Sequence, residues 1–125
     1  MTRSSTSILV ADDEEHLRSL IKTLLEDAGY SVVLVKNGNE ARAALLTQSF
    51  DILLTDLVMG GSDGLTLIGD VKKKHPKIQI VAMSGGGFVP LEQYLQIAKN
   101  AGARVTLSKP FTKASLLAAI AQATR

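Results

Sequence analysis

The sequence predicts an α/β protein whose parallel sheet is covered by helices on both faces. Short apolar segments alternate five times with segments whose apolar residues recur at helical spacing. Such alternation favours parallel strands joined by right-handed helical crossovers. The 125 residues have the size of one domain, and 46% hydrophobic and 21% charged content is typical of a globular chain.

The composition excludes several classes of protein. The chain has no cysteine, which excludes disulfides and thiolate metal sites and fits a reducing compartment. No segment approaches the roughly 20 apolar residues of a membrane span, and no signal-peptide core is long enough. The net charge of +2 is too small to indicate a nucleic-acid partner. We therefore expect a cytoplasmic protein that binds neither nucleic acid nor membrane.

The first strand is expected at residues 8–11, an apolar run that ends in four consecutive acids at 12–15. The last two of these acids suit the first turn of a helix, where anions are favoured. Asp12 and Asp13 precede that turn and exceed what capping requires. They are candidates for chemistry at the end of the strand.

The next elements are a helix, a strand and a second helix. Residues 17–28 carry leucine and isoleucine at helical spacing, and Gly29 suits the end of that helix. The valine-rich residues 31–35 predict the second strand. Asn37 can cap the second helix, with Glu40 as its capping-box partner.

The third strand lies in residues 51–60, an apolar run that ends in glycines and is typical of a strand buried on both faces. It places one carboxylate, Asp56, near its carboxyl end. Open parallel sheets bind ligands at that edge, so Asp56 is a candidate for chemistry. From this stretch alone, a simple cap of the following turn stays an equal alternative.

A third helix follows and stops before Pro76, and the basic residues 72–75 suit a solvated helix end because cations complement its dipole. The fourth strand is expected at residues 78–83. Pro90 can start the fourth helix, which Gly102 ends.

The fifth strand, residues 104–107, leads to a lysine, and Thr112 caps the last helix. Because all carboxyl ends of a parallel sheet lie at one edge, polar side chains from four strands are expected to converge there. They are Asp12, Asp13, Asp56, Ser84 and Lys109.

With these residues the chain resembles the receiver domains of the two-component response-regulator family. The resemblance rests on Asp12-Asp13, Thr55-Asp56-Leu57-Val58-Met59, Asp63-Gly64, Ser84 and Lys109-Pro110-Phe111. It implies a flavodoxin-like (βα)5 three-layer sandwich with the strand order known for this family, 2-1-3-4-5. It covers essentially the whole chain, so we expect one stand-alone receiver domain at residues 1–125, without an output domain.

The resemblance implies that Asp56 is a phosphoacceptor, which attacks a phosphohistidine of a sensor histidine kinase or histidine phosphotransfer protein and becomes an aspartyl phosphate. Clustered carboxylates call for a cation, and Mg²⁺ (or Mn²⁺) suits them. The implied ligands are Asp13, Asp56 and the Val58 backbone carbonyl, with Asp12 acting through a water. Lys109 and Ser84 would neutralise and hold the transferred group. The Lys109–Pro110 bond is expected to be cis.

For signal output, the family pairs the residue at Ser84 with an aromatic switch residue, and this chain has Thr106 at that place. We expect phosphorylation to order the glycine-rich loop at 85–87 and the start of the fourth helix. A downstream protein would bind the face of the fourth helix, fifth strand and fifth helix.

Two alternatives stay open beside this hypothesis. A phosphorylation-independent interaction module would keep the fold without the chemistry. A small enzyme is disfavoured, because Val58 replaces the second aspartate of an aspartate phosphatase and acids occupy the position of a flavin phosphate loop. The leading hypothesis is a protein that catalyses only its own phosphorylation and slow hydrolysis.

Overall fold

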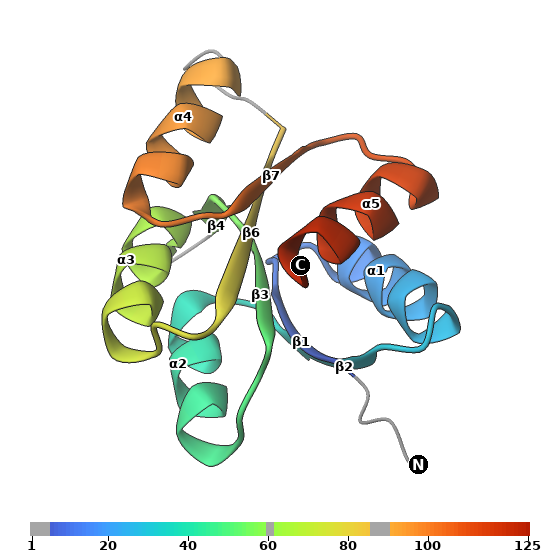
Figure 1. Cartoon of the computed structure of the whole chain (residues 1–125), viewed down its shortest axis with the longest axis horizontal. Coiled ribbons are helices and arrows are strands. Elements are labelled where there is room, and N and C mark those ends of the chain that lie inside the picture. Colours follow the sequence, from blue (N-terminus) through green and yellow to red (C-terminus); the bar gives the residue numbers. More distant parts are fainter. Residues whose placement is uncertain (1–5, 60–61, 86–90) are drawn as a thin grey trace.

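The computed structural model describes residues 6–59, 62–85 and 91–125. Its centre is a parallel sheet of five strands in the order β2-β1-β3-β6-β7. Numbered without the short pair β4 and β5, this is the expected order 2-1-3-4-5. Helices cover both faces, so the predicted three-layer architecture is confirmed (Figure 1).

The five strands of the sheet and the five helices follow one another as the sequence predicted, with shifts at their ends. The third strand is shorter than the expected residues 51–60, and a short strand pair at residues 58–59 and 62–63 was not predicted. The sheet strands are β1 (Ser7–Ala11), β2 (Ser31–Val35), β3 (Ile52–Asp56), β6 (Gln79–Ser84) and β7 (Val105–Ser108). The helices are α1 (Glu15–Asp27), α2 (Gly38–Thr47), α3 (Gly64–Lys74), α4 (Leu91–Ala101) and α5 (Lys113–Ala123). Two short strands, β4 (Val58–Met59) and β5 (Ser62–Asp63), pair antiparallel between β3 and α3.

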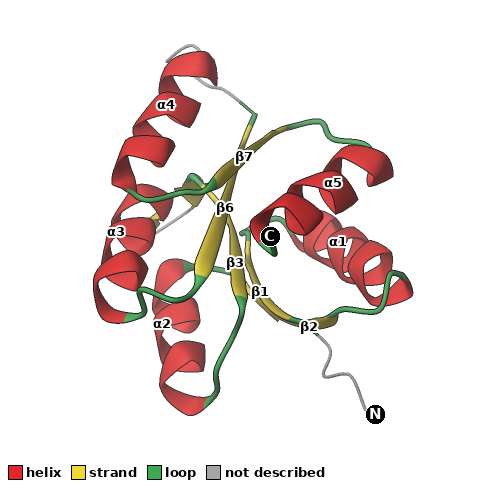
Figure 2. Ribbon diagram, in the orientation of Figure 1, coloured by secondary structure: helices red, strands yellow, loops and turns green. Residues whose placement is uncertain are grey.

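Two separate cores lie on the two faces of the sheet. Helices α2, α3 and α4 cover one face, and α1 and α5 cover the other (Figure 2). Every residue of β3 is buried, because this strand lies between β1 and β6 and beneath helices on both faces. In the sheet register, Leu53 of β3 lies between Leu9 of β1 and Ile80 of β6. The expectation of a strand buried on both faces is confirmed.

Side-chain caps fix the starts of two helices. The Asn37 side chain accepts a hydrogen bond from the Glu40 backbone N–H at 2.8 Å, as predicted. The Glu40 carboxylate, however, accepts from the Lys36 backbone N–H and not from Asn37, so the predicted capping box is wrong in that half. Thr112 and Ser115 form a complete capping box at α5. Each cap satisfies a backbone donor that the first helical turn leaves without a partner.

Two glycines with positive φ end helices, as their positions predicted. Gly29 has φ 99° after α1, and Gly102 has φ 130° after α4. These values are unfavourable for side chains with a β-carbon. One apolar position of α1 departs from the helical pattern, because Leu20 is 50% exposed.

Several expectations fall outside the described residues. These are the helix start at Pro90 and the proposed ordering of the glycine loop beyond Gly85. Among the helices that the structure describes, none is long and apolar enough to cross a lipid bilayer.

Candidate functional site

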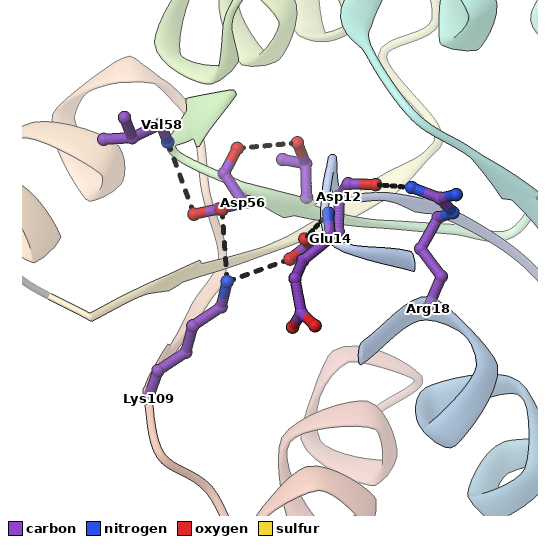
Figure 3. A network of polar contacts seen from close by, with 7 residues as sticks. Asp12, Glu14, Arg18, Asp56, Val58 and Lys109 are labelled. Carbon is purple, nitrogen blue, oxygen red and sulfur yellow. Dashed lines mark hydrogen bonds and ion pairs between the residues drawn. The ribbon is translucent and has the colours of Figure 1, made fainter. Parts of the chain in front are cut away.

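Four strand ends bring polar groups to the carboxyl edge of the sheet. Asp56 and Ser84 are the last residues of β3 and β6, Asp12 and Asp13 follow β1, and Lys109 follows β7. Figure 3 shows Asp12, Asp56 and Lys109 pointing toward one another. The convergence predicted for these three side chains is confirmed.

Lys109 joins two acids that are far apart in sequence. Its Nζ lies 2.9 Å from Asp12 Oδ2 and 3.1 Å from Asp56 Oδ2 (Figure 3). Its backbone N–H donates to the Ser84 carbonyl at 2.9 Å, which anchors the strand end from which the side chain extends. The Lys109–Pro110 peptide bond is cis, as the family resemblance implied.

Asp12 is fixed by contacts at every polar atom. Its N–H donates to the Val35 carbonyl and its carbonyl accepts from Arg18 Nη1 at 2.8 Å. Oδ1 accepts from the Glu14 backbone N–H at 2.9 Å, and Oδ2 receives Lys109. The idea that Asp12 exceeds the needs of capping is therefore wrong in part, because one oxygen supports the start of α1. The side chain is 0% exposed, so these contacts hold the carboxylate in place.

Asp56 is held by the turn that follows it. Its Oδ1 accepts from the Val58 backbone N–H at 3.3 Å, and its carbonyl accepts from the Thr55 hydroxyl at 2.9 Å. The start of α3 approaches this turn closely, because a β-carbon at Gly64 would overlap the Asp56 carbonyl and the Leu57 backbone. Glycine at this position thus allows the helix to lie against the site.

Burial and charge act in opposite directions on the two central groups. Burial raises the pKa of Asp56 and outweighs the opposing attraction of Lys109, while Asp12 raises it further. Burial lowers the pKa of Lys109, but its hydrogen bond to Asp12 and the charge of Asp56 dominate, so the pKa lies above its usual value. In a simple ion pair the acid would shift downward. The upward shift of Asp56 arises mainly from burial, which the attraction of the Lys109 ammonium group does not fully offset.

The three acids form a group that could hold a metal ion. One carboxylate oxygen from each of Asp12, Asp13 and Asp56 lies within 4.8 Å of the other two. Asp13 is exposed while the other two are buried, so the group opens to solvent on the Asp13 side. Oxygen donors of this kind, with room for water, suit a hard divalent cation.

The remaining candidate residues lie close by. Ser84 is 1% exposed at the end of β6, and Thr106 is half-buried on β7 beside Ala82. The metal role of the Val58 carbonyl and the switch roles of Ser84 and Thr106 stay predictions. Sequence analysis missed Arg18, whose guanidinium binds the Asp12 carbonyl. Its position on α1 gives no signal that separates it from an ordinary solvated arginine.

Comparisons with known proteins agree with this geometry. Residues 8–121 match the response regulator receiver domain family. The nitrogen assimilation regulatory protein NtrX of Azorhizobium caulinodans is 32% identical over 106 residues, covering 83% of this chain and 23% of that protein. The DNA-binding transcriptional regulator NtrC of Salmonella typhimurium is 36% identical over 77 residues, covering 62% of this chain and 16% of that protein. The crystal structure of the receiver domain of NtrX from Brucella abortus matches with a TM-score of 0.87 at 31% identity, covering 93% of this chain and 96% of that one.

A doubly wound α/β fold with several acids and a lysine at the carboxyl edge of its sheet is the arrangement expected of a receiver domain. The chain belongs to the response regulator receiver domain family. It is homologous to the response regulators of two-component systems, and it spans 23% of the length of the NtrX relative and 16% of that of the NtrC relative.

Proposed function

We propose that this receiver accepts a phosphoryl group on Asp56 from the phosphohistidine of a sensor histidine kinase or histidine phosphotransfer protein. The observation that carries the proposal is the paired contact of Lys109 with Asp56 and Asp12, across three strand ends. Structural ion pairs usually neutralise charge, yet here burial still raises the pKa of Asp56. An acid with a perturbed pKa at the carboxyl edge of such a sheet favours a chemical role over a purely structural one.

In the proposed reaction, a carboxylate oxygen of Asp56 attacks phosphorus as the bond from phosphorus to the imidazole nitrogen breaks. The electron pair of that bond returns to the imidazole, and a carboxyl phosphate forms on Asp56. Lys109 supplies a compact positive charge beside the accepting oxygen, and Ser84 supplies a hydroxyl from the neighbouring strand end. Slow attack of water on phosphorus would later release phosphate and restore the carboxylate. The protein would thus turn over no separate substrate.

The acid group fits Mg²⁺, or Mn²⁺, held by Asp13, Asp56 and the Val58 carbonyl, with Asp12 acting through a water. When bound, such a cation would neutralise the charge of the phosphoryl oxygens. Lys109 stays within reach of Asp12, so it would remain near the acceptor when a cation shares the Asp56 carboxylate. Exposure of Asp13 gives a route by which an ion could reach the group from solvent.

We further propose that output uses Ser84 and Thr106 and the face formed by α4, β7 and α5. Thr106 has no aromatic ring, so it does not offer the ring rotation expected of an aromatic switch. The conformational change would instead be transmitted through the backbone at the end of β6. The contact between the Lys109 N–H and the Ser84 carbonyl supports this, because it joins the two strand ends next to the acceptor.

The test is incubation of the intact chain with acetyl phosphate and Mg²⁺, followed by intact mass and by peptide mapping after borohydride trapping. We expect one phosphoryl adduct on Asp56, its loss in Asp56→Asn, and its retention in Asp27→Asn, which changes an exposed acid at the end of α1. Loss of the adduct with a chelator would support the cation. An unmodified wild-type chain would favour the phosphorylation-independent interaction module.

A further inference from the structure

A hollow lies at the end of the sheet opposite to the acids. It has a volume of about 610 Å³ and lies between the end of α2 and the segment that leads into β6. Its apolar lining includes Leu45, Leu46, Phe50 and Ile78. A smaller hollow of about 130 Å³ shares Leu45 and Leu46 and extends along α2 and α3. We call the two together the α2–α3 groove.

Leu46 projects from the rim of this groove. It is 85% exposed, whereas Leu45, Phe50 and Ile78 are between 6% and 8% exposed. A single exposed leucine is common on protein surfaces. Leu46, however, lies beside a hollow that is lined by apolar side chains, so an apolar ligand side chain bound in the hollow would also cover Leu46.

The rim of the groove is basic. Lys74 and Lys77 line it, together with His75. Among the described residues lining the two hollows, Asp70 is the one carboxylate, and Arg42 pairs with it at 2.8 Å. Lysines in the last turn of α3 complement its dipole and need no other explanation. Lys77 lies beyond the helix end, so the dipole does not account for it, and it extends the positive charge across the hollow.

We propose that the α2–α3 groove docks an acidic, amphipathic peptide segment of a protein partner. Apolar side chains of the segment would fill the hollow and cover Leu46, while its carboxylates would meet Lys74 and Lys77. A lipid surface fits less well, because Leu46 is the one strongly exposed large apolar residue among the described residues that line the groove, and an interfacial anchor needs several apolar side chains that project. Amphipathic helices bind such grooves through apolar anchors spaced three or four residues apart.

The groove is separate from the phosphoacceptor site. Phe50, which lines the groove, lies before the start of β3, and Asp56 is its last residue. At about 3.3 Å per strand residue, the two regions are roughly 20 Å apart along the strand. Docking in the groove would therefore leave Asp56 accessible, and its affinity should not depend on the phosphoryl group. The groove would hold the receiver beside a partner in both signalling states.

The first experiment selects 16-residue peptides from a random display library on the immobilised full chain, with Leu46→Asp as the comparison. We expect the wild-type chain to enrich peptides rich in Asp and Glu with apolar residues at helical spacing, and the variant to enrich none of them. The best peptide is then titrated into the labelled chain by NMR. We expect saturable amide shifts confined to residues 42–50 and 70–78 and a dissociation constant in roughly the micromolar range.

Variants then separate the apolar and the charged contributions. Leu46→Asp and the double change Lys74→Glu with Lys77→Glu should each weaken binding at least about tenfold, or 1.4 kcal/mol. Lys22→Glu, an exposed lysine of α1 on the other face, is the matched charge control and should bind as the wild type does. Thermal melts of each variant establish that it is folded.

Three results would overturn the proposal. The first is enrichment of basic peptides or of none. The second is unchanged affinity in Leu46→Asp. The third is preferential binding of the groove to phosphatidylglycerol vesicles over the selected peptide, which would assign the surface to lipid.

Discussion

Replacement of Lys109 by methionine tests whether this one ammonium group holds the acid cluster together. The change keeps the length and the apolar stem of the side chain but removes its charge. Asp12, which is 0% exposed, and Asp56 would then lie close together with no cation between them. We expect the variant to be folded but clearly less stable in buffer without divalent cations.

Removing one partner of a buried ion pair usually costs about 3–5 kcal/mol, because the remaining charge is left without compensation. The Lys109 side chain is 21% exposed and that of Asp56 is 10% exposed, so water relieves part of the penalty. We therefore expect about 3 kcal/mol, at the lower end of the range. With a urea slope of about 2 kcal/mol/M, the unfolding midpoint would fall by about 1.5 M.

The pH dependence follows from the direction of the pKa shifts. The folded-state pKa of Lys109 lies above 10.5, so its contribution is complete below that pH and is lost as the pH rises through the folded value. The difference between the two proteins should thus be constant near neutral pH and shrink in strong base. It should also shrink in acid, where Asp56, whose pKa is raised by burial, becomes protonated.

Urea unfolding at several pH values, with and without Mg²⁺, measures these effects. Added Mg²⁺ should restore part of the lost stability by binding the folded state. Lys22→Met, on the exposed side of α1, is the control and should change stability by less than about 0.5 kcal/mol. A midpoint shift below about 0.5 M in Lys109→Met, or a deficit unchanged in acid, would refute the electrostatic reasoning.

Three further predictions concern the same region. Asp56→Asn should raise the melting temperature near neutral pH. Because the folded-state pKa of Asp56 is raised, the stability associated with its protonated form is complete below pH 3.8 and is lost as the pH rises through the folded-state pKa. An unchanged or lower melting temperature would contradict this. Gly64→Ala should cost about 2 kcal/mol or more through overlap with the Asp56 carbonyl, whereas Gly69→Ala, with open space around it, should be neutral or stabilising in the same urea assay. Asp13→Asn should weaken Mg²⁺ binding at least about tenfold in calorimetric titration while the melting temperature of the cation-free chain does not fall, since this acid is exposed; equal affinity would remove Asp13 from the metal group.

Most of the fold could be predicted from the sequence because its local patterns agree with its topology. The apolar run of β3 and the glycines after α1 and α4 each carry a direct physical signal. Alternation of strand and helix then restricts the sheet to few arrangements. Exact helix ends were less predictable, as the bond from the Lys36 N–H to Glu40 illustrates. The Glu40 carboxylate had two candidate backbone donors, the N–H groups of Lys36 and Asn37, and the sequence does not decide between them.

The candidate site could be predicted in its members but not in its contacts. Asp12, Asp56 and Lys109 were expected to converge because parallel strands share one edge. The sequence did not reveal that Asp12 is fully enclosed while Asp13 faces solvent, since adjacent residues at a strand end can turn either way. The contact of Arg18 with the Asp12 carbonyl was also unpredictable, because a solvated arginine on α1 has the same local pattern.

The contact between Lys109 and Asp12 closes a loop of 97 residues. The arrangement of Asp12, Asp56 and Lys109 therefore forms only after β7, the last strand, has docked onto the sheet. A newly synthesised or partly unfolded chain would lack this arrangement. The chain would therefore become able to accept a phosphoryl group only when folding is complete. A substitution that displaces a strand of the sheet would then prevent phosphorylation without changing any of these three residues.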